Sequence, residues 1–201
     1  SGAKMVTPRY QGPKWYVAAS DGKSLSDTTT NYDLGSSSSP INHLSNGIEI
    51  AAAGDTIVMM KGTHTGSNNR GINEDGNKSF VIIGDPDYSA DQTIIDAGGR
   101  DRHFTFDSNE DTTFQIIGLT LYNGKTTGRG GGSIKIENGA VKLKNVIFKE
   151  NYSTGENWAT SGAIWMTSNS TATIEGCTFD GNYIYNTEAG NIGGAILAEH
   201  Q

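Results

Sequence analysis

The sequence has a single cysteine, no excess of positive charge and no long hydrophobic run. Cys177 is the only cysteine in 201 residues, so an internal disulfide is excluded. The formal net charge is −7 and the basic residues form no stripe, which argues against nucleic acid as a partner. No run approaches the roughly 18 apolar residues of a membrane-spanning helix. We therefore expect one domain with its own core, without nucleic acid and without a membrane span in this segment.

A sustained helical period is also missing. No segment keeps a period of 3.6 residues through a whole repeat, which excludes helical solenoids. The sequence is instead rich in glycine, with 27 residues, and it repeats itself. Gly132–Ile134 recurs as Gly162–Ile164 and Gly194–Ile196, which are 30 and 32 residues apart, and Phe148–Asn151 recurs as Phe179–Asn182. A repeat of this length indicates stacked supersecondary units.

Each repeat contains three short alternations of apolar and polar residues, which predict three half-buried strands. In one repeat these are Ser133–Ile136, Ala140–Leu143 and Val146–Phe148. The corner between the second and third strands needs a residue that accepts a positive φ, and it falls on Gly84, Gly118, Asn145 and Gly176. The sequence therefore predicts an all-β fold, a parallel β-helix (solenoid) of about five coils. The crossover rule makes it right-handed.

The register of these strands predicts which side chains stack inside the solenoid. Lys142 and Lys144 point outward in this register, and a shift of one residue would bury them. The four predicted inward stacks are Phe80, Phe114, Val141 and Ala172; Ile82, Ile116, Leu143 and Ile174; Leu119, Val146 and Cys177; and Leu121, Phe148 and Phe179.

The two ends of the chain are expected to differ. Residues 1–54 form a lead-in and a capping segment, in which Ser39 and Pro40 begin a short amphipathic helix over residues 41–51. Residues 55–201 form the coils. The last residues, 196–201, start a new coil, so we expect either a longer protein or an end that a partner or another copy covers.

Two stretches resemble known proteins. Gly54–Ile57 followed by Gly62–Gly66 resembles the N-terminal signature of right-handed β-helix proteins of the pectate-lyase-like superfamily. The later coils resemble the repeats of chlamydial polymorphic outer membrane proteins, whose marks Gly-Gly-Ala-Ile and Phe-x-x-Asn stand here at Gly193–Ile196, Phe148–Asn151 and Phe179–Asn182. The resemblance implies a parallel β-helix and an extracellular or cell-surface location, often in adhesins. It supplies no catalytic motif that matches residues of this chain.

The register also brings outward side chains together on the first strand of each repeat. Trp165 lies between Lys135 and Leu197 in one outward column. An outward tryptophan beside polar groups suits a sugar ring, whose C–H face stacks on the indole. The alternative is that the loop 152–160 covers Trp165, with Trp158 against the ring.

A second outward column places Asp107 next to Glu137. Neighbouring coils are about 4.8 Å apart, so the two carboxylates would touch. Such a pair could bind Ca²⁺ or act as acid and base. The alternative is a solvated sheet edge at which Lys135 offsets the charge.

Arg100, Arg102 and His103 form the one mixed basic cluster, at a corner before a first strand. It could clamp the carboxylate of a uronate, with arginine binding in a bidentate manner, or it could be a corner salt bridge. The four histidines show no metal-ligand spacing.

The favoured function is a non-catalytic, adhesin-like module that presents a rigid wall to a glycan or to a host or neighbouring surface protein. One alternative is a polysaccharide lyase or hydrolase of the pectate-lyase-like class. Another is a structural subunit that stacks end to end in a surface fibre through its open last coil. Fold alone does not decide among these functions.

Overall fold

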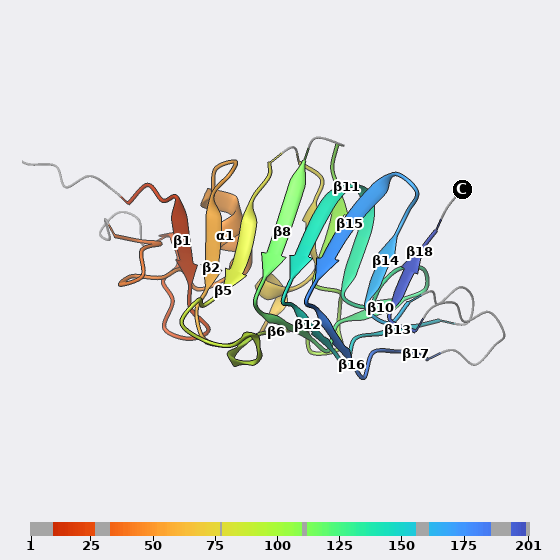
Figure 1. Ribbon diagram of the computed structural model, residues 1–201. Coiled ribbons are helices and arrows are strands. Elements are labelled where there is room, and N and C mark those ends of the chain that lie inside the picture. The colour runs from red at the N-terminus through yellow and green to blue at the C-terminus, as the bar shows by residue number, and fades with distance from the viewer. Residues whose placement is uncertain are drawn as a thin grey trace, which may run out of the picture.

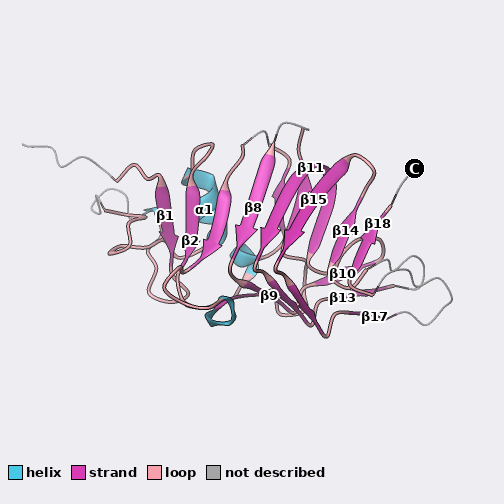
Figure 2. Ribbon diagram, in the orientation of Figure 1, coloured by secondary structure: helices cyan, strands magenta, loops and turns pink. Residues whose placement is uncertain are grey.

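The computed structural model describes residues 10–26, 33–76, 78–109, 112–155, 161–185 and 194–199. These residues wind into a parallel β-solenoid of about four turns with very little helix (Figures 1 and 2). The predicted all-β parallel β-helix is confirmed. No helix in the described ranges is long and apolar enough to cross a membrane.

The strands stack into faces that run along the solenoid, and the first three correspond to the predicted strands. Face 1 contains β4 (Ile72–Glu74), β7 (Phe104–Asp107), the first part of β11 (Ile134–Lys144), β14 (Ile164–Met166) and β18 (Ile196–Ala198). Face 2 contains β1 (Lys14–Val17), β2 (Thr56–Met59), β5 (Val81–Gly84), β8 (Thr113–Ile117), the second part of β11 and β15 (Ser170–Glu175). Face 3 contains β3 (Gly62–His64), β6 (Thr93–Asp96), β9 (Thr120–Tyr122), β12 (Ile147–Lys149) and β16 (Thr178–Asp180).

A fourth, shorter face was not predicted. It contains β10 (Lys125–Thr127), β13 (Tyr152–Thr154) and β17 (Tyr183–Tyr185). The assignment of residues 152–154 to a covering loop is therefore wrong. Each of these strands has three residues, which is too short for alternation to stand out, although aromatic and β-branched residues favour strands.

The core has the predicted register. Val141 pairs with Phe114 on one side and Ala172 on the other, and Phe148 pairs with Leu121 and Phe179. The rings of Phe148 and Phe179 stack with centroids 4.9 Å apart. In another stack Ile116 pairs with Ile82 and Leu143, and Leu143 pairs with Ile174. The residues of the remaining stack, Leu119, Val146 and Cys177, directly precede the paired residues of face 3. Lys142 and Lys144 are exposed.

The corners confirm the prediction at three of four positions. Gly118, Asn145 and Gly176 have φ of 62°, 53° and 60°. Gly84 instead ends strand β5, where a Cβ would lie 2.0 Å from the carbonyl oxygen of Gly118. Glycine is needed there for close approach of two backbones, and the predicted positive φ is wrong.

The asparagine of the Phe-x-x-Asn motif holds the corner between faces 3 and 4. Asn151 is fully buried; its side-chain nitrogen donates to the Leu121 carbonyl at 2.9 Å, and its oxygen accepts from the Gly124 amide at 2.8 Å. Asn182 repeats this one coil later and donates to the Phe148 carbonyl at 2.8 Å. The motif thus satisfies backbone groups that the corner takes out of the ladder.

The helix α1 (Leu44–Ile50) begins later than predicted. Ile41 pairs with Val17 as an isolated bridge, so Ser39 and Pro40 belong to an extended segment and not to a cap. The side-chain oxygen of Asn69, 25 residues away, instead accepts from the Leu44 amide at 2.8 Å. Backbone pairing with β1 has overridden the local capping signal. Leu44 and Ile48 are buried in the core, and the helix contacts β1 and β2 (Figure 1).

Truncation of Phe148 should strongly destabilise the solenoid. Its side chain is fully buried between Leu121 and Phe179, so Phe148→Ala should lower the free energy of unfolding by about 3–5 kcal/mol. Urea denaturation followed by circular dichroism would measure this loss. Lys144→Ala, at an exposed position, should change stability by at most about 0.5 kcal/mol. A loss below about 1 kcal/mol for Phe148→Ala would contradict the register.

The last coil leaves apolar side chains uncovered. Ile174 and Ile196, which face inward in register, are each 37% exposed. We expect the 201-residue chain to self-associate through this face, so its mass in light scattering should rise with concentration. Ile174→Lys should suppress this association because it places a charge on the apolar face. A constant monomer mass at high protein concentration would contradict the prediction.

Candidate functional site

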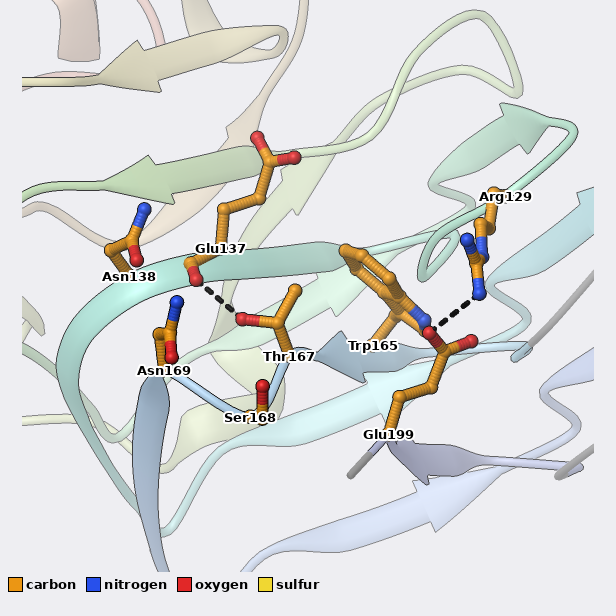
Figure 3. Close-up of a pocket in the computed structure, with 8 residues that line it drawn as sticks. All are labelled: Arg129, Glu137, Asn138, Trp165, Thr167, Ser168, Asn169 and Glu199. Atoms are coloured by element: carbon orange, nitrogen blue, oxygen red, sulfur yellow. Dashed lines mark hydrogen bonds and ion pairs between the residues drawn. The ribbon is translucent and has the colours of Figure 1, made fainter. Parts of the chain in front are cut away.

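A pocket of about 270 Å³ opens on the outer side of face 1 (Figure 3). Its side chains come from β11, from β14 and the turn that follows it, and from the residues after β10 and β18. The lining residues are Arg129, Glu137, Asn138, Trp165, Thr167, Ser168, Asn169 and Glu199. The pocket therefore combines successive turns of the solenoid, and parallel strand pairing holds their spacing.

Strand β11 shapes one wall because it contains a bulge. Ile136 pairs with Phe106 on β7, but the next pair joins Asn138 to Asp107 and skips Glu137. The extra residue shifts the register locally, as a β-bulge does. The predicted carboxylate pair between Asp107 and Glu137 is therefore wrong.

Each of those two carboxylates has another partner. The side-chain amide of Asn138 donates to Asp107 Oδ1. Lys135 Nζ lies 2.6 Å from Glu137 Oε1, as the alternative of a sheet edge with an offsetting lysine predicts. The hypotheses that this pair acts as acid and base or binds Ca²⁺ both required Asp107 and Glu137 to lie opposite each other, and they do not.

Trp165 pairs with the predicted neighbours but is less exposed than an open platform would be. It pairs with Lys135 and Leu197, on the outside of the solenoid, but is only 5% exposed. Lys135 Nζ lies 5.4 Å and Arg129 Cζ 6.0 Å from the ring centroid, both within the range of cation–π attraction. The expectation of an open stacking platform is wrong, because the ring is covered, but the loop 152–160 that was expected to cover it stays untested. Residues 156–160, which include Trp158 of the expected cover, lie outside the described residues.

The indole nitrogen of Trp165 is the unusual atom of the pocket. It is buried and donates no hydrogen bond, whereas Trp15, which is also buried, donates to Asp55 Oδ2 at 2.8 Å. In Figure 3 the nitrogen of Trp165 points toward the side chains of Arg129 and Glu199. A buried donor without an acceptor costs about 1–3 kcal/mol. An oxygen atom of a ligand would remove that cost.

Arg129 and Glu199 form an ion pair beside this nitrogen (Figure 3). Arg129 Nη2 is 2.8 Å from Glu199 Oε2, and the two side chains are 55% and 20% exposed. They are 70 residues apart in the sequence, so the pair connects separate turns of the solenoid. A pair this exposed contributes about 0–1 kcal/mol. A ligand that approaches the indole nitrogen can therefore displace this ion pair at little cost in free energy.

The predicted basic cluster does not form one site. His103 is fully buried and faces the core, with Nε2 donating to the Ile95 carbonyl at 3.0 Å and Nδ1 lying 3.0 Å from Ser133 Oγ. Arg102 is partly buried and donates through Nη2 to Thr126 Oγ1, and Arg100 is exposed. Burial lowers the pKa of Arg102, with the charges of Asp101 and Glu137 opposing the shift. His103 is therefore excluded from the expected clamp, because its ring faces the core and cannot reach a ligand that Arg100 binds.

The described residues bring no three histidine, cysteine or acidic side chains together as a metal site. In the acidic loop at residues 85–91, Asp85 accepts from the Asp87 amide at 3.2 Å and Asp91 accepts from Ser89 Oγ at 2.5 Å. These carboxylates serve the local turn.

A second hollow of about 330 Å³ adjoins the pocket. Both hollows are lined by Ser168 and Asn169, the turn between β14 and β15. The second hollow is otherwise lined by Gly139, Ala140, Ser170 and Thr171. A ligand longer than one ring can therefore extend from face 1 toward face 2.

Sequence reasoning found Trp165 and Glu137 but missed Arg129, Asn138 and Asn169 as pocket residues. Arg129 follows the unpredicted strand β10 in a glycine-rich segment, and nothing in its neighbourhood indicates its direction. Asn138 enters the pocket because of the bulge, which has no sequence signal apart from Asn138-Gly139 within a strand.

Acidification should destabilise the fold through His103. Burial, opposed by hydrogen bonds to the backbone of Ile95 and Tyr122, lowers its pKa to about 4, whereas an unfolded chain has a value near 6.5. The unfolded state then binds more protons between these values, so the contribution to stability is complete above about pH 6.5 and is lost as the pH falls through about 4. We expect a loss of about 3 kcal/mol in the free energy of unfolding across that window.

Urea titrations at several pH values would measure this loss. His103→Asn, which keeps a donor and an acceptor, should show a shallower dependence on pH than the parent. Equal slopes for the two proteins would show that His103 does not account for the acid sensitivity.

No family model and no curated protein matches this sequence. Among solved structures, the chain is similar to a rhamnogalacturonan lyase with a TM-score of 0.46 and 15% sequence identity, over 94% of this chain and 66% of that one. The chain thus spans slightly less than two thirds of the length of that protein. Its assignment as a parallel β-solenoid rests on its own strand pairing.

Proposed function

We propose that this chain is a non-catalytic glycan-binding module of an extracellular or cell-surface protein, and that the pocket at Trp165 is its sugar site. The observation that carries the proposal is the buried indole nitrogen without an acceptor, at a pocket lined by amide, hydroxyl and carboxylate groups. Sugar hydroxyls both donate and accept hydrogen bonds, so they suit such a mixed lining.

The geometry favours hydrogen bonding to the edge of the indole over stacking on its face. With Trp165 only 5% exposed and two cations near its ring, little of the ring face is open to a ligand. The nitrogen lies at the ring edge and needs one acceptor. A ligand hydroxyl that reaches it would replace an unmade hydrogen bond, which makes the contribution larger than that of an average one.

The rigidity of the site also supports binding. Trp165 lies on a strand that pairs on both sides, with β11 and β18, so its position is largely set before a ligand arrives. Preorganisation of this kind lowers the entropy cost of binding. The adjoining hollow beyond Ser168 and Asn169 suits an oligosaccharide over a single sugar.

A polysaccharide lyase or hydrolase is the second candidate, because the same pocket contains two carboxylates, Glu137 and Glu199, beside Arg129. An enzyme would cleave the bound oligosaccharide, whereas a binding module would leave it intact. Incubation of the bound oligosaccharide with the protein, with and without Ca²⁺, followed by chromatography and ultraviolet absorbance, would reveal new reducing ends or unsaturated products. Cleavage that Glu199→Gln abolishes would replace the binding proposal with the enzyme.

Removal of the indole N–H should weaken binding without loss of the ring. A glycan array would first identify an oligosaccharide, and calorimetric titration would then compare the parent with Trp165→Phe. We expect the dissociation constant to rise at least about fivefold, because the bound ligand satisfies a donor that the free protein leaves unpaired. Thermal unfolding of both proteins controls for folding. Equal affinity in a folded Trp165→Phe would exclude the indole nitrogen as a ligand contact, and no binding to any glycan would overturn the proposed function.

A further inference from the structure

We infer that the Trp165 pocket selects neutral sugars with adjacent hydroxyl groups over uronic acids, with Glu199 as the acceptor of that hydroxyl pair. This inference rests on the proposed function and assigns the class of ligand. It follows from the acceptors that line the pocket, from the unpaired donor of Trp165 and from the charge of the pocket.

Several lining groups offer acceptors to a ligand. The hydroxyl of Thr167 donates to the Glu137 carbonyl, so its oxygen is left to accept. The side-chain amide of Asn138 donates one N–H to Asp107 and keeps its oxygen as an acceptor. The carboxylates of Glu137 and Glu199 add further acceptors. A ligand rich in O–H donors fits this lining, whereas the carboxylate of a uronate is an acceptor only.

The charge of the pocket also favours a neutral sugar over a uronate. Two glutamates and one arginine line it, and the whole chain has a net charge of −7. A uronate that paired with Arg129 would place a second carboxylate beside Glu199, which is 20% exposed and already pairs with the same guanidinium. The two carboxylates would then share one cation and repel each other.

A neutral diol avoids this repulsion. Two adjacent hydroxyls can donate to the two oxygens of Glu199, and hydrogen bonds to a charged acceptor are about twice as strong as neutral ones. One of these hydroxyl oxygens can also accept from Trp165 Nε1, toward which Glu199 is placed (Figure 3). Arg129 then moves into solvent, where its side chain is already 55% exposed. In the free protein, Arg129 is thus a competitor for the acceptor that the sugar uses.

Substitution of Arg129 tests the inference, because the two ligand classes predict opposite results. Arg129→Ala removes the competitor, so a neutral oligosaccharide should bind up to about fivefold more tightly, while a uronate that used Arg129 would bind more weakly. The probes are matched pairs of oligosaccharides that share ring and linkage, such as tetragalacturonate and the tetragalactose made by reduction of its carboxylates, with mannuronate and mannose oligomers as a second pair. Calorimetric titration measures each affinity.

Two variants complete the experiment. Lys144→Ala removes an exposed ion pair on face 2, with Glu175 at 2.9 Å, and should leave every affinity unchanged. Glu199→Gln keeps the size of the side chain but not its charge, and should weaken the neutral oligosaccharide at least about tenfold. Thermal unfolding would show that each variant is folded.

The outcomes separate the two proposals. Preference for the neutral members, with tighter binding by Arg129→Ala, supports the inference. Tighter binding of the uronates, lost in Arg129→Ala, overturns the inference and leaves the glycan-binding function in place. If neither these pairs nor any glycan on an array binds the parent protein, the proposed function itself fails.

Discussion

Parallel hydrogen bonding between successive coils fixes the positions of both the core residues and the pocket residues. Each strand pairs with the equivalent strand of the turns before and after it, so a residue's neighbours are set by its position in the repeat. A slip of one residue would move the whole inward set to the surface. This explains why Val141 lies between Phe114 and Ala172 while Lys142 is exposed on the same strand. Hydrophobic burial and ladder hydrogen bonds thus favour one register.

At the corners, backbone groups need hydrogen-bond partners other than the neighbouring strands. Backbone groups leave the ladder where the chain turns, and a buried group without a partner is expensive. Asn151 and Asn182 supply side-chain donors and acceptors at one corner. At another, a Cβ on Gly132 would lie 2.4 Å from the Gly162 carbonyl oxygen, so glycine is required for the coils to approach. The two repeated motifs are therefore consequences of coil stacking, and they have no need of a ligand to account for them.

The pocket occurs where this regularity is interrupted. The bulge before Asn138 and the turn at Ser168 and Asn169 move side chains away from the positions that a perfect repeat would give them. Trp165 remains in register, yet its nitrogen lacks the acceptor that Trp15 has in Asp55. His103 differs from Trp165, since both of its buried ring nitrogens have partners in the core. A buried polar group left without a partner beside an accessible pocket is a reason to look for a ligand, and one with partners is a structural residue.

The repeat length, the three main strands of each coil and the inward columns could be predicted from the sequence. These properties follow from side-chain alternation and from residues that meet local backbone needs, such as Gly118 and Asn145 at the corners. The sequence also placed Trp165 between Lys135 and Leu197, because the register carries over from coil to coil. Three features could not be predicted in this way: Trp165 is covered, Asp107 meets Asn138 in place of Glu137, and His103 faces the core. Those outcomes depend on a bulge, on an ion pair between side chains 70 residues apart and on the packing of a whole coil, and no local pattern of residues encodes contacts over such separations.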